Sequence, residues 1–193
     1  AESCGQYYKE KKKELSEDPE QFMNGLCSIM NHAVCHYGKE NKINSMGTTA
    51  AMLAFGKENV YSCNLGDSRI YKISPEGKLG QLSLDHVLGG GRFGKPPLTQ
   101  YLGIPEESMG LEPTIVPQKA EIGTRYLICS DGITDMLSDG EIADILTREI
   151  SVSETVELLV ERALIKGGRD NITVILCELV EQEKSLFGKL LNY

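Results

Sequence analysis

The sequence has no apolar run approaching the about 20 residues that cross a lipid bilayer. It also lacks the order of basic, apolar and small residues that marks a secretory signal peptide. Basic residues are outnumbered, with 20 Lys and Arg against 28 Asp and Glu among 193 residues. Nucleic-acid binders and anionic-membrane binders present basic surfaces, so this balance argues against both classes. We therefore predict a cytoplasmic protein with neither a nucleic-acid nor a membrane partner.

The cysteines and histidines show no metal-binding spacing. The six cysteines form no CxxC pair, and Cys63, Cys129 and Cys177 lie in apolar, strand-like runs where a thiol behaves as a small hydrophobe. His32 and His36 are four residues apart and would share a helix face, but no third ligand accompanies them at a suitable spacing. We predict structural thiols, and histidines that are exposed or packed rather than metal-bound.

Hydrophobic periodicity predicts an α+β domain with its helices and strands in separate blocks. Asp18 and Pro19 are a helix start, as cap and first-turn residue. Asp139 is expected to cap a later helix, and Ser151 with Glu154 fits a capping box before the next one. The remaining predicted elements are a weak helix over 2–15, an antiparallel strand meander over 47–55, 59–65, 69–74 and 78–84, an irregular segment over 88–118, and strands at 124–129 and 171–179.

Three aspartates stand at the ends of apolar strands and are candidate metal ligands. Asp67 and Asp131 each follow such a strand, and Asp170 precedes one. Carboxylates that converge at the rim of a sheet suit the hard cations Mg²⁺ and Mn²⁺. Each aspartate also neighbours a glycine or lies close to one, so ordinary turn chemistry explains any one of them taken alone. No Ser-His-Asp order, P-loop or HExxH motif offers another chemistry.

Five short motifs in order resemble those of the type 2C metal-dependent protein serine/threonine phosphatases. They read GTT at 47–49, GDSR at 66–69, DH at 85–86, CSDGITD at 129–135 and GRDNITV at 168–174. The segment LTQYLG at 98–103 is similar to one in which bacterial members usually carry Arg in place of Gln100. The resemblance covers residues 45–180 closely and the preceding helices loosely.

This resemblance implies a four-layer αββα sandwich, in which two antiparallel sheets are flanked by helix pairs. Residues 1–180 would form the single phosphatase-like domain and 181–193 a C-terminal tail. The family uses a two-metal centre, with Mn²⁺ or Mg²⁺, to present hydroxide to phosphoserine or phosphothreonine. Phosphorylated proteins, and a cognate serine/threonine kinase pathway in signal transduction, are the implied partners.

The motif match also implies roles for individual residues. Asp131 and Asp170 would hold one metal of the pair, and Asp67 with Asp131 would hold a third, weaker metal. Gly132 and Asn171 would shape the ligand loops, while Ser68 and Arg69 would fix the geometry of their turn. Thr48, Thr49 and His86 are expected to support the site structurally, and Asp135 and Asp139 to serve as loop stabiliser and helix cap.

Two family patterns have no counterpart in the sequence. These are an early strand with an Arg that binds substrate phosphate, and a DGxGG turn whose Asp bridges both catalytic metals. We therefore expect a domain that lacks its first two strands, has little activity by itself, and associates through exposed sheet edges. Two hypotheses follow: a full-length active phosphatase of which this chain is a part, and a catalytically dead phosphatase-like module that binds and regulates a phosphoprotein or another partner.

Overall fold

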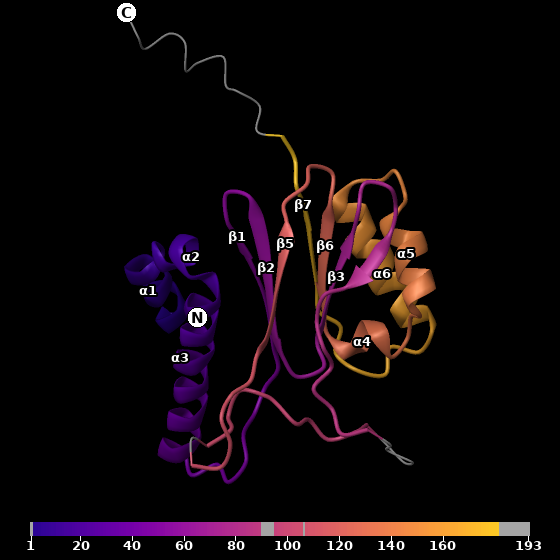
Figure 1. The fold of residues 1–193 in the computed structure, drawn as a ribbon. Coiled ribbons are helices and arrows are strands. Elements are labelled where there is room, and N and C mark those ends of the chain that lie inside the picture. Colours follow the sequence, from indigo (N-terminus) through magenta and orange to yellow (C-terminus); the bar gives the residue numbers. More distant parts are fainter. Residues whose placement is uncertain (1, 90–94, 106, 182–193) are drawn as a thin grey trace, which may run out of the picture.

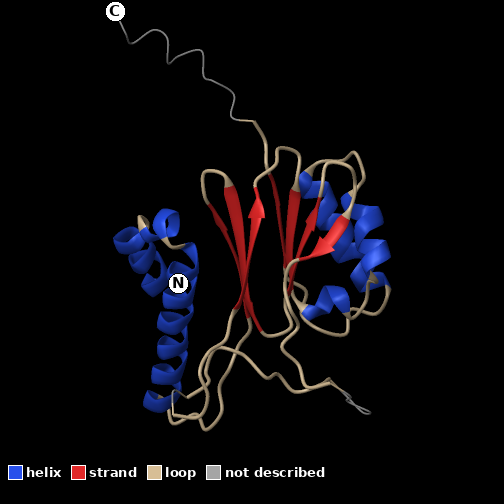
Figure 2. Cartoon of the chain, in the orientation of Figure 1, coloured by secondary structure: helices blue, strands red, loops and turns tan. Residues whose placement is uncertain are grey.

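A computed structural model describes residues 2–89, 95–105 and 107–181 (Figure 1). Two β-sheets lie face to face, and each outer face is covered by a layer of helices (Figure 2). All strand pairs within the two sheets are antiparallel. The α+β sandwich with its αββα order of layers is therefore confirmed. The last residues of the predicted tail, 182–193, lie outside the described residues.

The first helical layer is built around one long amphipathic helix. Its members are α1 (Glu2–Lys11), α2 (Glu14–Glu17) and α3 (Pro19–Glu40). The side chain of Asp18 accepts a hydrogen bond from the Gln21 amide at 3.0 Å, which confirms the predicted cap of α3. The buried stripe of α3, which includes Phe22 and Cys27, packs against the first sheet.

The first sheet has the order β1-β2-β5 and the second the order β4-β3-β6-β7. The strands of the first sheet are β1 (Ala50–Phe55), β2 (Asn59–Leu65) and β5 (Thr114–Lys119). Those of the second are β3 (Arg69–Ile73), β4 (Leu79–Gln81), β6 (Arg125–Cys129) and β7 (Val174–Glu178). Both orders place strands that are distant in sequence side by side.

The predicted four-strand meander is wrong at its centre, because β2 and β3 belong to different sheets. Gly66 has φ of +99°, and a Cβ there would lie 2.4 Å from Cγ2 of Thr49. A glycine is needed at such a position, and it turns the chain out of the first sheet into the second. Strand periodicity reports which residues are buried but not which strand pairs with which. The turn places Asp67 at one end of the sandwich.

The second helical layer consists of α4 (Asp131–Thr134), α5 (Asp139–Leu146) and α6 (Val152–Ile165). Ser151 and Glu154 form the predicted capping box of α6. The cap predicted for α5 is wrong by one residue: Ser138 is the N-cap and forms a second capping box with Glu141. Asp139 instead accepts a hydrogen bond from the Tyr71 hydroxyl, at 2.9 Å.

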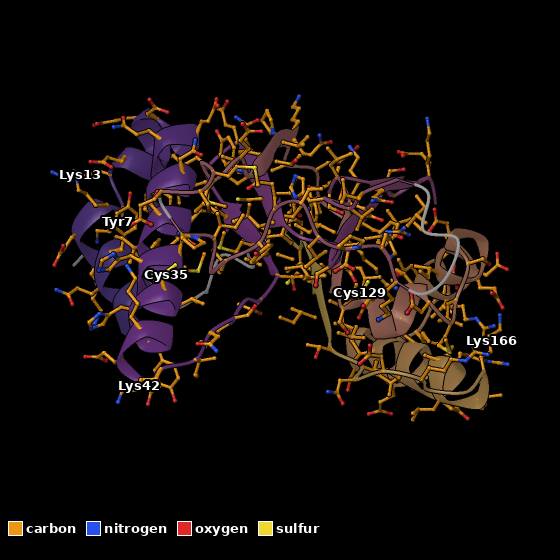
Figure 3. All side chains as sticks on the ribbon, turned by 90° about the horizontal axis from the view of Figure 1, so that it is seen from below. Tyr7, Lys13, Cys35, Lys42, Cys129 and Lys166 are labelled. Atoms are coloured by element: carbon orange, nitrogen blue, oxygen red, sulfur yellow. The ribbon has the colours of Figure 1, made fainter. Side chains whose placement is uncertain are left out.

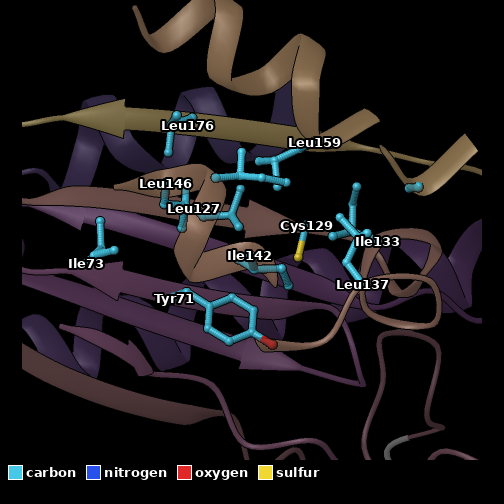
Figure 4. Close-up of a cluster of buried hydrophobic side chains, with 12 residues drawn as sticks. Tyr71, Ile73, Leu127, Cys129, Ile133, Leu137, Ile142, Leu146, Leu159 and Leu176 are labelled. Carbon is cyan, nitrogen blue, oxygen red and sulfur yellow. The ribbon is translucent and has the colours of Figure 1, made fainter. Parts of the chain in front are cut away.

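The core of the second half lies between its sheet and helices. Figure 4 shows Tyr71, Ile73 and Leu127 on the strands, facing Ile142 and Leu159 on the helices. Seen from the end of the sandwich, side chains also fill the space between the two sheets (Figure 3). A third buried cluster, containing Val60, Ile70, Leu82 and Tyr126, joins the two sheets.

The cysteines carry no disulfide, and all six are free. Cys27 of α3 and Cys63 of β2 are fully buried, and their sulfur atoms lie 3.6 Å apart. The predicted role as small packing residues fits this pair, which joins the first helical layer to its sheet. The described helices are all too short or too polar to cross a membrane.

Replacing Leu159 with Ala should lower the free energy of unfolding by about 2–5 kcal/mol, because Leu159 is 0% exposed and its loss leaves a cavity. Urea unfolding measures this change. Leu164→Ala on the same helix is the matched control: Leu164 is 58% exposed, so we expect a change within about 0.5 kcal/mol. Equal losses in both variants would contradict the assigned core.

Candidate metal centre

Asp131 and Asp170 lie at the same end of the second sheet, where β6 ends and β7 begins. β6 and β7 are antiparallel neighbours, and Cys129 at the end of β6 pairs with Val174 at the start of β7. Asp131 follows β6 as the first residue of α4, and Asp170 precedes β7. The strand ends thus bring two carboxylates together from positions 39 residues apart in the sequence.

The loops that carry these two aspartates are held together by Ser130. Its hydroxyl donates to the carbonyl oxygen of Asn171 at 3.0 Å and accepts from the Thr173 amide at 3.0 Å. The Ser130 amide donates to the carbonyl oxygen of Thr173 at 3.0 Å. These bonds fix the backbone on which the carboxylates stand.

Gly132 permits the closest approach between the same loops. A Cβ atom at this position would lie 2.3 Å from the carbonyl oxygen of Asn171, and the glycine is buried. No side chain fits in that space. Gly132 and Asn171 therefore meet through backbone atoms, and their role in shaping ligand loops stays a prediction.

A lysine from the irregular segment lies between the carboxylates. Nζ of Lys95 donates to Asp131 and, at 2.7 Å, to Oδ2 of Asp170. It also pairs with Oδ2 of Asp135 at 3.2 Å. The Lys95 ammonium lowers the pKa of Asp170, and the Asn171 amide lowers it further with a 2.8 Å hydrogen bond. The three carboxylates raise the pKa of Lys95. One cation is therefore shared by three aspartates.

Asp67 contributes a further negative charge to this end of the sandwich. Burial raises its pKa, and the charge of Asp131 raises it again. The hydroxyl of its neighbour Ser68 hydrogen-bonds to the Thr49 hydroxyl at 2.8 Å. This bond connects the turn to the residue just before β1 of the first sheet. The charges of Asp67 and Asp131 thus influence each other at this end of the sandwich. Their role as the ligands of a third metal stays a prediction.

Arg69 serves a separate network. Its guanidinium donates to both oxygens of Asp85, with Nη2 at 2.7 Å from Oδ2, and Nη1 donates to the Tyr71 hydroxyl at 3.0 Å. Nη1 also lies 3.7 Å from Oδ1 of Asp139. These contacts hold the segment after β4 against β3. The predicted role of Arg69 in the geometry of its own turn stays a prediction.

His86 supports the turn that carries Asp67. Its Nδ1 accepts a hydrogen bond from the Gly66 amide at 3.2 Å, so Nε2 carries the proton and faces the Thr114 hydroxyl at 3.0 Å. Burial lowers the pKa of His86, against the weaker opposing effect of Asp85 and Glu112. A neutral, buried histidine between two backbone segments fits the structural role expected of it.

Sequence reasoning missed Lys95 altogether and gave Asp135 a different role. Asp135 follows Asp131 by four residues across the short helix α4, a spacing that places both on one face and could have signalled the cluster. Lys95 sits in a stretch without periodicity, and no local pattern relates it to the aspartates. Gln100, by contrast, is buried and holds Gly110 and Glu112 through its amide.

The carboxylates of Asp131 and Asp170 form a donor set of the kind that a hard divalent cation prefers. Asp131 and Asp170 already bind one cation, the Lys95 ammonium, and Mg²⁺ commonly keeps several waters beside one or two carboxylates. Among the described residues, no group of three or more His, Cys, Asp or Glu is arranged to hold a metal ion.

Comparison with known proteins gives a consistent set of relatives. A family profile described as Protein phosphatase 2C matches residues 1–166. The serine/threonine phosphatase stp of Listeria welshimeri is 32% identical over 175 residues, covering 84% of this chain and 69% of that protein. The protein phosphatase PhpP of Streptococcus pneumoniae is 33% identical over 183 residues, covering 88% of this chain and 72% of PhpP.

Solved structures of similar proteins share the fold. The serine/threonine phosphatase of S. agalactiae superposes with a TM-score of 0.74 at 28% identity, covering 86% of this chain and 72% of that one. The catalytic domain of the serine/threonine phosphatase PstP, in complex with two manganese ions, superposes with a TM-score of 0.73 at 28% identity. That alignment covers 94% of this chain and 82% of the PstP chain.

Substituting Ala for Gly132 should lower the free energy of unfolding by about 1–3 kcal/mol, because the added methyl group collides with backbone at Asn171. Gly140→Ala is the matched control: a Cβ there meets nothing within 4 Å, so the change should stay below about 1 kcal/mol. Chemical denaturation compares the two. A Gly132→Ala protein as stable as the control would show that the loops are not in contact.

Stability should fall as the pH drops from 7.5 to 5.5, because His86 is held neutral in the folded protein. Its folded pKa lies below the unfolded value of about 6.5. The unfolded chain therefore binds more protons in this window and is favoured as the pH falls. Urea unfolding at both pH values measures the slope. We expect a shallower slope for His86→Asn than for the wild type; identical slopes for the two proteins would contradict the assignment.

Proposed function

This chain belongs to the protein phosphatase 2C family, and from that membership we propose that the full-length protein hydrolyses phosphoserine and phosphothreonine on proteins in a metal-dependent reaction. Two bacterial relatives that bear the names of serine/threonine and protein phosphatases support the reaction class. Residues 1–180 would form the domain that carries the reaction, and 181–193 a tail outside it. The metal would be Mn²⁺ or Mg²⁺.

The convergence of Asp131 and Asp170 on one cation carries this proposal. Both carboxylates are anchored by hydrogen bonds between their loops, so a cation would meet them already in place. A divalent ion bound there would supply a Lewis acid for the phosphoryl oxygens and would acidify a water molecule. Asp67 would add its carboxylate on the side of Asp131, as the basis of a further and weaker metal site.

The remaining site residues would act on the geometry of these carboxylates. Gly132 and Asn171 would keep the two loops at contact distance, and Ser68 would hold the turn before β3 through Thr49. Arg69 would hold the segment after β4 through Asp85. In this proposal none of these four groups touches the substrate.

We propose further that the 193-residue chain by itself has little activity. The carboxylates of Asp131 and Asp170 would hold one metal ion, whereas the PstP catalytic domain is described with two manganese ions. An ion held by only two carboxylates binds weakly, because water molecules fill its other coordination positions. Loss of one preorganised group at such a site commonly costs about 100-fold or more in rate.

The proposed substrates are phosphorylated proteins, and the natural source of such substrates is a serine/threonine kinase. A pathway that pairs the two enzymes in signal transduction is part of the proposal. The outer strands of the sheets, such as β1 and β7, have one unpaired edge within the described residues. Pairing of such an edge with a second copy would give an oligomer.

A second candidate function is a catalytically dead phosphatase-like module that binds and regulates a phosphoprotein or another partner. One observation favours it: the position between Asp131 and Asp170 is filled by the ammonium group of Lys95. A protein that satisfies its own carboxylates in this way has less need of a metal ion. The two candidates differ in whether any divalent metal supports turnover.

Hydrolysis of a phosphothreonine peptide and of p-nitrophenyl phosphate, with and without Mn²⁺, tests the proposal on the full-length protein and on this chain. We expect Mn²⁺-dependent turnover by the full-length protein and at least about 100-fold less by this chain. Asp131→Asn should remove the turnover, because it deletes one of the two charges that hold the ion.

Asp144→Asn is the matched control for that substitution, since Asp144 is an exposed carboxylate on α5. It should leave turnover unchanged. Turnover by the full-length protein that persists in Asp131→Asn, or that needs no divalent metal, would refute the proposed site. Absence of turnover with every divalent metal, together with retained binding of a phosphoprotein, would favour the regulatory module. Strong turnover by this chain would refute the proposed weakness.

A further inference from the structure

Lys95 is positioned by a short antiparallel ladder rather than by a loose loop. The Leu88 amide donates to the carbonyl oxygen of Pro97 at 3.0 Å, and Val87 forms a bridge with Leu98. Lys95 stands two residues before this ladder. The two prolines that follow it, at 96 and 97, have fixed φ angles and restrict the backbone between the lysine and the ladder. The ladder thus holds the backbone near Lys95 in a position from which the ammonium group reaches the end of the second sheet.

The contacts of Lys95 come from the segment that follows β6 and from the segment that precedes β7. Nζ reaches Asp131 and Asp135 on the α4 side and Asp170 on the β7 side. Among the residues that the structure describes, no other Lys or Arg forms an ion pair with any of these three. The side chain of Lys95 is 49% exposed, so the ammonium approaches the carboxylates from the solvent side.

Carboxylates at this spacing repel one another, and some positive charge must offset the repulsion. The Lys95 ammonium supplies one charge and hydrogen-bonds to the same two aspartates that would hold a metal ion. A divalent cation bound between Asp131 and Asp170 would occupy the same space and bring a second positive charge. The ammonium and the metal ion therefore cannot both make these contacts.

We propose that Lys95 is a tethered counter-ion that competes with the divalent metal for Asp131 and Asp170, and so sets the metal affinity of this site. The identity of the competing ion rests on the proposed function. The competition itself rests on the contacts of Lys95. Metal binding then requires the ammonium to leave the carboxylates, and the affinity is lower than the two aspartates alone would give.

Calorimetric titration of the metal-free chain with MnCl₂ tests this competition. Lys95→Gln removes the charge and keeps much of the side chain's length, so we expect it to bind Mn²⁺ about tenfold more tightly than the wild type. Lys78→Gln is the matched control, because it also removes one positive charge, from an exposed lysine in the turn between β3 and β4. It should bind as the wild type does. Adding Asp131→Asn to Lys95→Gln should abolish binding and identify the site.

Thermal unfolding gives a second and independent readout. In EDTA, Lys95→Gln should melt at a lower temperature than the wild type, because three carboxylates lose their counter-ion. In saturating Mn²⁺ the difference should vanish or reverse, since the ion replaces the ammonium. The control Lys78→Gln should show no such dependence on metal.

Unchanged or weaker Mn²⁺ affinity in Lys95→Gln overturns the proposal, as does failure of both proteins to bind Mn²⁺. These outcomes are separate from those for the proposed function. A tenfold gain in the affinity of this chain, together with no hydrolysis by the full-length protein, supports the competition and counts against the phosphatase reaction. Hydrolysis by the full-length protein without a change in affinity supports the reaction and overturns the competition.

Discussion

Electrostatic repulsion between carboxylates at one end of the sandwich is the constraint on which the site depends. Asp131, Asp135 and Asp170 can stand together only because hydrogen bonds between their loops hold the backbone and a cation offsets their charge. Ser130 and Gly132 provide the first condition, and Lys95 provides the second. The arrangement depends on the second sheet, because the two loops can touch only where the end of β6 pairs with the start of β7.

The helices and the core hold that sheet edge rigid. α5 and α6 cover the outer face of the second sheet with fully buried side chains such as Ile142 and Leu159. The two sheets are joined by a separate cluster that includes Ile70 and Tyr126. A close-packed interior of this kind has low compressibility, so it holds the strands that carry the two loops in fixed positions.

Much of the fold was predictable because it is encoded in local patterns. Asp18 before Pro19 marks the start of α3, and Ser151 with Glu154 marks the start of α6. The predicted strand meander is wrong where the pairing of strands does not follow from their order in the sequence. β2 and β3 follow each other closely in sequence, yet the turn at Gly66 places them in different sheets. The N-cap of α5 is Ser138 and not the predicted Asp139, because Ser138 forms a reciprocal capping box with Glu141.

The sequence by itself determined the family and the aspartates at strand ends, because motifs and periodicity are properties of neighbouring residues. The order of layers followed from the resemblance to that family. Only the tertiary structure decided what those aspartates contact. Lys95 lies 36 residues before Asp131 and 75 before Asp170, in a segment with no periodic pattern. Its meeting with them depends on the ladder of Val87 with Leu98 and on the register of β6 with β7. Contacts that depend on the pairing of distant strands leave no trace in a local pattern, and the charge balance of this site is one of them.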